Sequence, residues 1–195
     1  MSSVAVRVLR VLLIAAAVAV AAGSTARASL MIPLELNELV KRSDHIAVVD
    51  VVSVTSAWDA KHERILSTIQ LDVVEAWKGP AAPAARITVV QPGGTVDDIT
   101  MVVFGLAQFK PGERTLLFLR GRMGAAAVVG MAQGRRPLTR DALTGKWMAE
   151  GPDRSGVAFT HPPGASSAAA IESTMRRRTL DEMREEIRGI VKAAR

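Results

Sequence analysis

Short apolar segments separated by turns that contain Gly or Pro constrain the fold of this chain more than any other feature. Segments of this kind, rich in β-branched residues, are typical of β-strands. They lie at residues 46–55, 65–77, 86–91, 101–104, 114–120, 125–131 and 146–148. Regularly spaced strands with helices only at the ends predict a mainly β protein, built as a small antiparallel barrel or sandwich.

The most informative single segment is Phe109–Arg120. Pro111 and Gly112 are the residues that a tight turn requires, because Pro fixes φ and Gly accepts a positive φ. Residues 115–119 that follow are apolar or β-branched without alternation, which predicts a strand buried on both faces. We expect this strand to pair with residues 125–131 across a turn at 121–124.

Two helices are predicted at the ends of the strand region. Leu36, Leu39 and Val40 recur at helical spacing and predict a short N-terminal helix. Near the C-terminus, Thr179 and Glu182 have the spacing of a capping box. An apolar stripe follows at Leu180, Met183, Ile187, Ile190 and Val191. We therefore expect a barrel domain at 29–150, a linker rich in Gly, Pro and Ser at 151–167, and a C-terminal amphipathic helix within 168–195.

The first 28 residues predict a cleaved secretory signal peptide. Arg7 and Arg10 precede an apolar run at 11–22, and small residues including Ala28 provide a cleavage site before Ser29. The run is shorter than the roughly 20 residues that span a membrane, so a retained anchor is the less favoured alternative. We expect the protein in the periplasm or outside the cell, with no membrane span after cleavage.

The composition excludes several classes of function. The chain has 195 residues and no cysteine, which rules out disulfides, thiolate metal sites and cysteine nucleophiles. Its net charge is +6, and loss of three arginines with residues 1–28 would leave 22 basic and 19 acidic residues, a charge of +3. Tyr is absent and the other aromatic residues are few. Nucleic-acid binding, which uses basic patches and aromatic stacking, is therefore not expected.

The sequence offers only weak candidates for a metal site or a catalytic site. Asp59, His62 and Glu63 share one connection between strands and could join as a metal site, although a solvated loop is the favoured interpretation. Asp97 and Asp98 follow Gly93–Gly94 but lack the ligand spacing of a calcium loop. Neither a G-x-S-x-G motif nor a phosphate-binding loop is present. We expect no cofactor and no catalytic residue.

Charged residues at two other places have ordinary structural interpretations. A lone acid in a strand, Asp50, is expected to face solvent at a sheet edge. Three consecutive arginines at 176–178 precede the C-terminal helix, where the helix dipole disfavours positive charge. They hint at an electrostatic partner, but a solvated connection is the favoured interpretation.

A family resemblance supports the barrel. Residues 36–52 (LNELVKRSDHIAVVDVV), 69–79 (IQLDVVEAWKG) and 109–119 (FKPGERTLLFL) resemble the netrin-like and tissue-inhibitor-of-metalloproteinases group across residues 34–134. The chain also resembles uncharacterised exported bacterial proteins with segments like Pro92–Gly94 and Gly130–Gly134. The resemblance implies an OB-like β-barrel. It does not carry over protease inhibition, because those inhibitors chelate zinc through an N-terminal cysteine, and Ser29 stands at the predicted mature N-terminus.

Three functions follow as hypotheses. The leading one is a non-enzymatic, exported binding module that recognises a secreted or periplasmic protein. The second is a protease inhibitor or protease accessory protein that uses the Ser29 amine and adjacent loops. The third is a metal-dependent enzyme centred on Asp59, His62 and Glu63.

Overall fold

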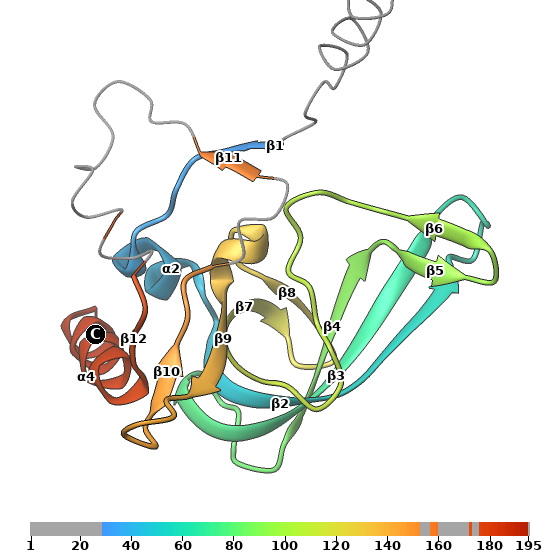
Figure 1. Cartoon of the computed structure of the whole chain (residues 1–195). Helices are drawn as coiled ribbons and strands as arrows, with labels where there is room; N and C mark the ends of the chain where they lie inside the picture. The colour runs from blue at the N-terminus through green and yellow to red at the C-terminus, as the bar shows by residue number, and fades with distance from the viewer. Residues whose placement is uncertain (1–28, 153–156, 160–171, 173–175, 195) are drawn as a thin grey trace, which may run out of the picture.

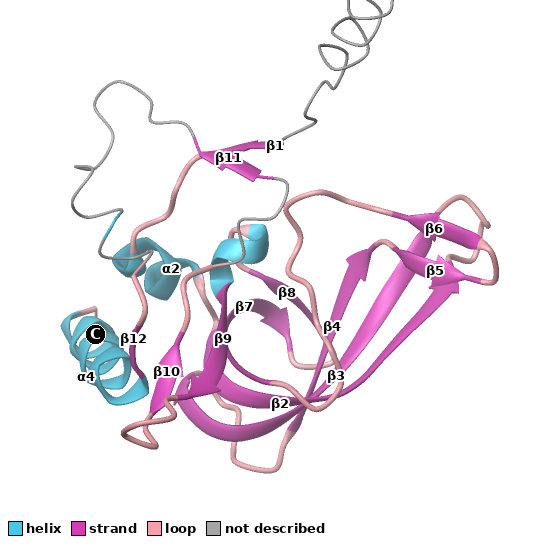
Figure 2. Ribbon diagram, viewed as in Figure 1, coloured by secondary structure: helices cyan, strands magenta, loops and turns pink. Residues whose placement is uncertain are grey.

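The computed structural model describes residues 29–152, 157–159, 172 and 176–194, and they form a mainly β protein with two α-helices (Figures 1 and 2). The elements are β1 (Ser29–Met31), α2 (Leu36–Arg42), β2 (His45–Trp58), β3 (Ile65–Lys78), β4 (Arg86–Pro92), β5 (Gly94–Val96), β6 (Ile99–Met101), β7 (Arg114–Arg122), β8 (Ala125–Val128), a 3₁₀ helix (Met131–Gly134), β9 (Arg135–Arg140), β10 (Trp147–Ala149), β11 (Val157–Phe159), β12 (Arg178–Thr179) and α4 (Leu180–Ala193). The predicted mainly β class and both terminal helices are confirmed.

Eight strands form the main sheet, in the order β12-β10-β9-β7-β2-β3-β4-β8, and β8 also pairs with β7. Long antiparallel pairing joins β2 to β3 along almost their whole length. The β7–β8 hairpin pairs Leu119 with Val128 and Arg122 with Ala125, as the sequence predicted. Two small sheets lie outside the main one, β5 with β6 and β1 with β11.

Strand β7 is buried on both faces, and this explains its unbroken apolar sequence. Leu116 and Phe118 belong to one core, which includes residues of α2 and α4. Leu117 and Leu119 belong to a second core, built mainly from β2, β3 and β4. The apolar residues of β2 divide between the same two cores, so β2 and β7 form the wall that separates them.

Helix α4 packs on the first core through its predicted apolar stripe. Leu180, Met183 and Ile187 are buried, and the capping box is formed. The backbone N–H of Glu182 donates to Thr179 Oγ1 at 3.2 Å, and the Thr179 N–H donates to Glu182 Oε2 at 3.0 Å. Figure 1 shows α4 beside α2, on the opposite side of the molecule from the β5–β6 hairpin. No helix in the described part of the chain is long and apolar enough to cross a membrane.

Several details differ from the sequence prediction. The strand expected at 101–104 is β6, which ends at Met101, and the strand expected at 125–131 ends at Val128. Strand β9 was not predicted, because Pro137 lacks the backbone N–H that a strand usually needs. Asp50 was expected at a sheet edge but lies on β2 between β3 and β7. Arg114 stabilises it there, donating from Nε and Nη2 at 2.6 and 2.7 Å.

The predicted linker lies mostly outside the described residues, as do residues 1–28 of the predicted signal peptide. The segment that follows the predicted cleavage site is described, and Gln133 holds it. Its Oε1 accepts from the Leu34 N–H at 2.7 Å, and its Nε2 donates to the Ile32 carbonyl at 3.1 Å. Because Gln133 is itself buried, these two bonds tie the segment after β1 to the 3₁₀ helix that follows β8.

Glu75 on β3 connects the sheet to α4. Arg184 donates to both Glu75 carboxylate oxygens at 2.8 Å, and these bonds hold the pKa of Glu75 below its usual value. A lowered pKa means that the unfolded chain binds this proton more tightly than the folded chain does. The Glu75–Arg184 pair therefore contributes its full stabilisation at pH values above the unfolded pKa of Glu75, about 4.3. This stabilisation is lost as the pH falls through the lower pKa of Glu75 in the folded state.

We expect Glu75→Gln to lower the free energy of unfolding at pH 7 by about 1 kcal/mol, because the pair is partly solvent-exposed. The deficit should shrink markedly at pH 3. Urea unfolding of both proteins at the two pH values measures it. Asp72→Asn, which removes an exposed pair with Arg86, is the control and should cost less. A deficit for Glu75→Gln that is equal at both pH values would contradict this assignment.

Candidate functional site

The predicted metal candidates lie in the β2–β3 connection and act there as turn residues. Asp59 Oδ1 accepts from the backbone N–H of Glu63 at 2.8 Å, and Asp59 also pairs with Arg64. These bonds, the Glu63 N–H first, lower the pKa of Asp59. His62 stacks on Trp58 with ring centroids 5.8 Å apart. Within the described residues, no three His, Asp or Glu side chains come together as a metal site.

The other charged candidates also have structural partners or lie in solvent. Asp97 and Asp98 are exposed at the turn between β5 and β6. Arg177 pairs with Glu150 at 2.9 Å, and Arg178 pairs with Glu186 at 2.5 Å. Arg177 and Arg178 therefore stabilise the position of the segment before α4. These two arginines of the cluster have local partners, which accounts for their place in the sequence.

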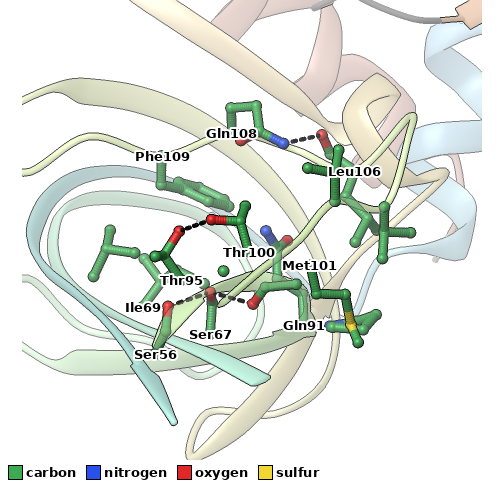
Figure 3. Close-up of a pocket in the computed structure, with 16 residues that line it drawn as sticks. Ser56, Ser67, Ile69, Gln91, Thr95, Thr100, Met101, Leu106, Gln108 and Phe109 are labelled. Carbon is green, nitrogen blue, oxygen red and sulfur yellow. Dashed lines mark hydrogen bonds between the residues drawn. The ribbon is translucent and has the colours of Figure 1, made fainter. Parts of the chain in front are cut away.

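The structure instead places a pocket where β2, β3 and β4 meet the β5–β6 hairpin and the segment after it (Figure 3). Its cavity volume is about 260 Å³. The described polar side chains that line it are Ser56, Ser67, Gln91, Thr95, Thr100 and Gln108. The apolar ones include Val54, Ile69, Met101, Leu106 and Phe109. None of the described lining residues is charged, so the pocket offers neutral hydrogen-bonding groups on an apolar wall.

A chain of hydroxyl groups forms one side of the pocket. Ser67 Oγ donates to the Gly93 carbonyl at 2.7 Å, and the Ser56 and Ser67 oxygens lie 3.0 Å apart (Figure 3). A serine has one hydroxyl proton, and a carbonyl can only accept. Because the Ser67 proton points to Gly93, Ser56 must donate to Ser67. Each hydroxyl group therefore has one defined acceptor, the Gly93 carbonyl for Ser67 and Ser67 Oγ for Ser56.

Gly94 allows this arrangement because the backbone passes directly against the two serines. Its φ is +127°, and a Cβ built there would lie 2.2 Å from Ser56 Oγ and 2.6 Å from Ser67 Oγ. The adjacent Gly93 N–H donates to the Ile65 carbonyl at 2.8 Å, which fixes the start of the hairpin on β3. The Gly-Gly sequence therefore shapes the pocket in addition to making the turn between β4 and β5.

The far side of the pocket is set by the segment that leads to β7. Gln91 Nε2 donates to the Ala107 carbonyl at 2.9 Å. Phe109 follows, and the Arg135 guanidinium lies over its ring, 5.4 Å from the ring centroid. Glu113 accepts from Arg135 at 2.6 Å and from the Lys110 N–H at 3.0 Å. The turn at 110–113 thus positions Phe109 at the pocket, a role that the sequence did not indicate.

Three exposed apolar side chains lie on the hairpin side of the pocket. Ile99, Val102 and Phe104 are 55%, 64% and 47% exposed. All three belong to β6 or to the residues directly after it, and Val102 itself lines the pocket together with Met101 and Val103. We call this group the apolar rim. Large apolar side chains gathered at one place on a surface, unlike single scattered ones, are typical of interaction sites.

A second cavity, of about 450 Å³, lies at Asp50, Arg114 and Trp147 and is more open. Asp50 and Arg114 pair with each other at 2.6 Å, and the third charged lining residue, Glu113, pairs with Arg135 at 2.6 Å. Arg114 and Arg140 both lie over the Trp147 ring, at 5.2 and 4.6 Å from its centroid. These groups already satisfy one another, so this cavity is the weaker candidate for a ligand.

No protein-family model and no curated protein matches the sequence, and no solved structure matches the fold. The similarity to the netrin-like group therefore stays a prediction, and the function has to be argued from the pocket itself. Sequence reasoning missed the pocket because its hydroxyl and amide residues come from separate segments with no motif spacing. The Pro92-Gly93-Gly94 turn was the one signal that pointed to this place.

We expect Gly94→Ala to destabilise the protein more than Gly112→Ala does, by about 2 kcal/mol. Both positions have positive φ, but a Cβ at Gly112 would meet no atom within 4 Å. The excess therefore reports the close contact with Ser56 and Ser67. Urea denaturation of both variants measures the difference, and equal losses would show that the contact at Gly94 relaxes without cost.

Proposed function

We propose that the protein is an exported, non-enzymatic binding module, and that its pocket and apolar rim form the binding site for a secreted or periplasmic protein. The observation that carries the proposal is the combination at one place of an uncharged pocket and the exposed side chains of Ile99, Val102 and Phe104. Interfaces with this character bury an apolar anchor of the partner in a pocket and exclude water around it.

We further propose that five strands form an OB-like barrel. The pairings that support it run β7-β2-β3-β4-β8 and return from β8 to β7. The β4–β8 contact is parallel, through Val89 and Ala126, whereas the other four are antiparallel. The second core, with buried Ile69, Ile87 and Leu117, would fill the interior of such a barrel.

Several features favour binding over catalysis at this pocket. The Ser67 proton is directed at a carbonyl, and Ser56 donates to Ser67, so neither hydroxyl is hydrogen-bonded to a base. The described lining holds no histidine and no carboxylate that could take a proton from either serine. The remaining polar groups are amides and threonines, which recognise neutral groups by hydrogen bonds.

Export rests on the predicted signal peptide. Cleavage after Ala28 would leave Ser29 as the first residue, and Ser29 is the first residue of β1, which pairs in parallel with β11. A chain that starts at Ser29 would therefore keep every described element. The partner is accordingly sought among proteins of the periplasm or the culture medium.

The test is affinity capture from the periplasmic and secreted fractions of the source organism. We expect one protein to be retained by the wild type and lost with the double variant Val102→Ser/Phe104→Ser. Both side chains are exposed, so the substitutions should leave the free energy of unfolding within about 0.5 kcal/mol of the wild type.

Leu143→Ser provides the matched control, because Leu143 is 97% exposed and lies outside the pocket lining and the apolar rim. This variant should retain the partner. Equal retention by the rim variant and the control variant would contradict the proposed site. Hydrolytic turnover by the purified protein that one Ser, His or Asp substitution abolishes would contradict the non-enzymatic assignment.

A further inference from the structure

We infer that the pocket takes an aromatic ring of the partner that carries one hydrogen-bond donor, as a Trp or Tyr side chain does, with the donor directed at Ser56 Oγ. This inference rests on the proposed function and specifies which chemical group of the partner enters the pocket.

The first argument is the direction of the hydroxyl chain. Ser67 donates to Gly93 at 2.7 Å, so the hydroxyl proton of Ser56 is used on Ser67 at 3.0 Å. Ser56 Oγ then has only lone pairs left to offer. A ligand group at this oxygen must be a donor, such as an indole N–H or a phenol O–H. A carbonyl or ether oxygen there would meet the lone pairs and gain nothing.

The second argument is size. The cavity volume of about 260 Å³ lies below the range of roughly 300–1,000 Å³ that is usual for pockets of small-molecule ligands. A space of this size suits one side chain. The apolar rim beside it would then contact the residues that flank the inserted side chain.

The third argument is the character of the walls. Val54, Ile69 and Phe109 supply apolar and aromatic surface, and Figure 3 shows the Phe109 ring beside the hydrogen-bonded hydroxyl groups of Thr95 and Thr100. An aromatic ligand ring gains more than an aliphatic one from a neighbouring aromatic ring. None of the described lining side chains is charged, so an ionised side chain would lose its hydration without finding a counter-charge.

The experiment compares indole with benzofuran, a ring of nearly the same shape in which an oxygen replaces the N–H. Each is titrated into the ¹⁵N-labelled purified protein, and amide shifts are followed by NMR. We expect both probes to shift the amides of Gly93, Gly94 and Thr95, with indole bound several-fold more tightly, on the order of fivefold. Ser56→Ala should bring the affinity for indole down to that for benzofuran.

Thr55→Ala is the control, because Thr55 is the adjacent residue of β2 and its hydroxyl donates to the Thr68 carbonyl outside the pocket lining. It should leave the preference for indole intact. Absence of shifts with either probe would overturn the pocket as a binding site, and the proposed function with it. Binding of both probes with equal affinity, or a preference for indole that persists in Ser56→Ala, would overturn only the donor inference. The comparison of indole with benzofuran on the wild-type protein tests the donor inference even if Ser56→Ala fails to fold.

Discussion

Burial of β2 and β7 on both faces is the constraint on which the rest of the structure depends. Each strand divides its apolar side chains between two cores, as Leu116 and Leu117 do on successive positions of β7. A wall of this kind is stable only if both sides are covered. Helices α2 and α4 cover one side, and β3, β4 and β8 cover the other. The arrangement leaves the β5–β6 hairpin outside both cores.

The pocket follows from how that hairpin joins the sheet. Gly93 and Gly94 bring the backbone against Ser56 and Ser67 at a distance that only glycine permits. The side chain of Gln91 and the turn at 110–113 fix the other end of the same segment. The segment that closes this uncharged cavity is thus fixed at Gly93–Gly94 and at the turn 110–113. Val102 and Phe104, which lie between these two places in the chain, remain exposed. A pocket anchored at both ends beside exposed apolar side chains supports the proposed recognition of a protein.

The elements that the sequence predicted are those with a strong local signal. The apolar run of 115–119, the capping box of Thr179 and Glu182, and the spacing of Leu36, Leu39 and Val40 each identify an element without knowledge of its neighbours. Strand β9 was missed because Pro137 contradicts the local rule, and its pairing with β7 and β10 outweighs that rule. The pocket was missed for a different reason. Ser56 and Ser67 face each other across the β2–β3 pairing, but Thr95 joins them only through the β5–β6 hairpin, and no spacing along the chain encodes that contact.

The most direct measurement of the central claim is site-specific photo-crosslinking in the source organism. A photoreactive amino acid replaces Phe104 in one strain and Leu143, the exposed apolar residue outside the site, in another. Binding through the pocket and apolar rim predicts a discrete crosslinked adduct from position 104 and none of that mass from position 143. The absence of any adduct from 104, or the same adduct from both positions, would contradict the claim.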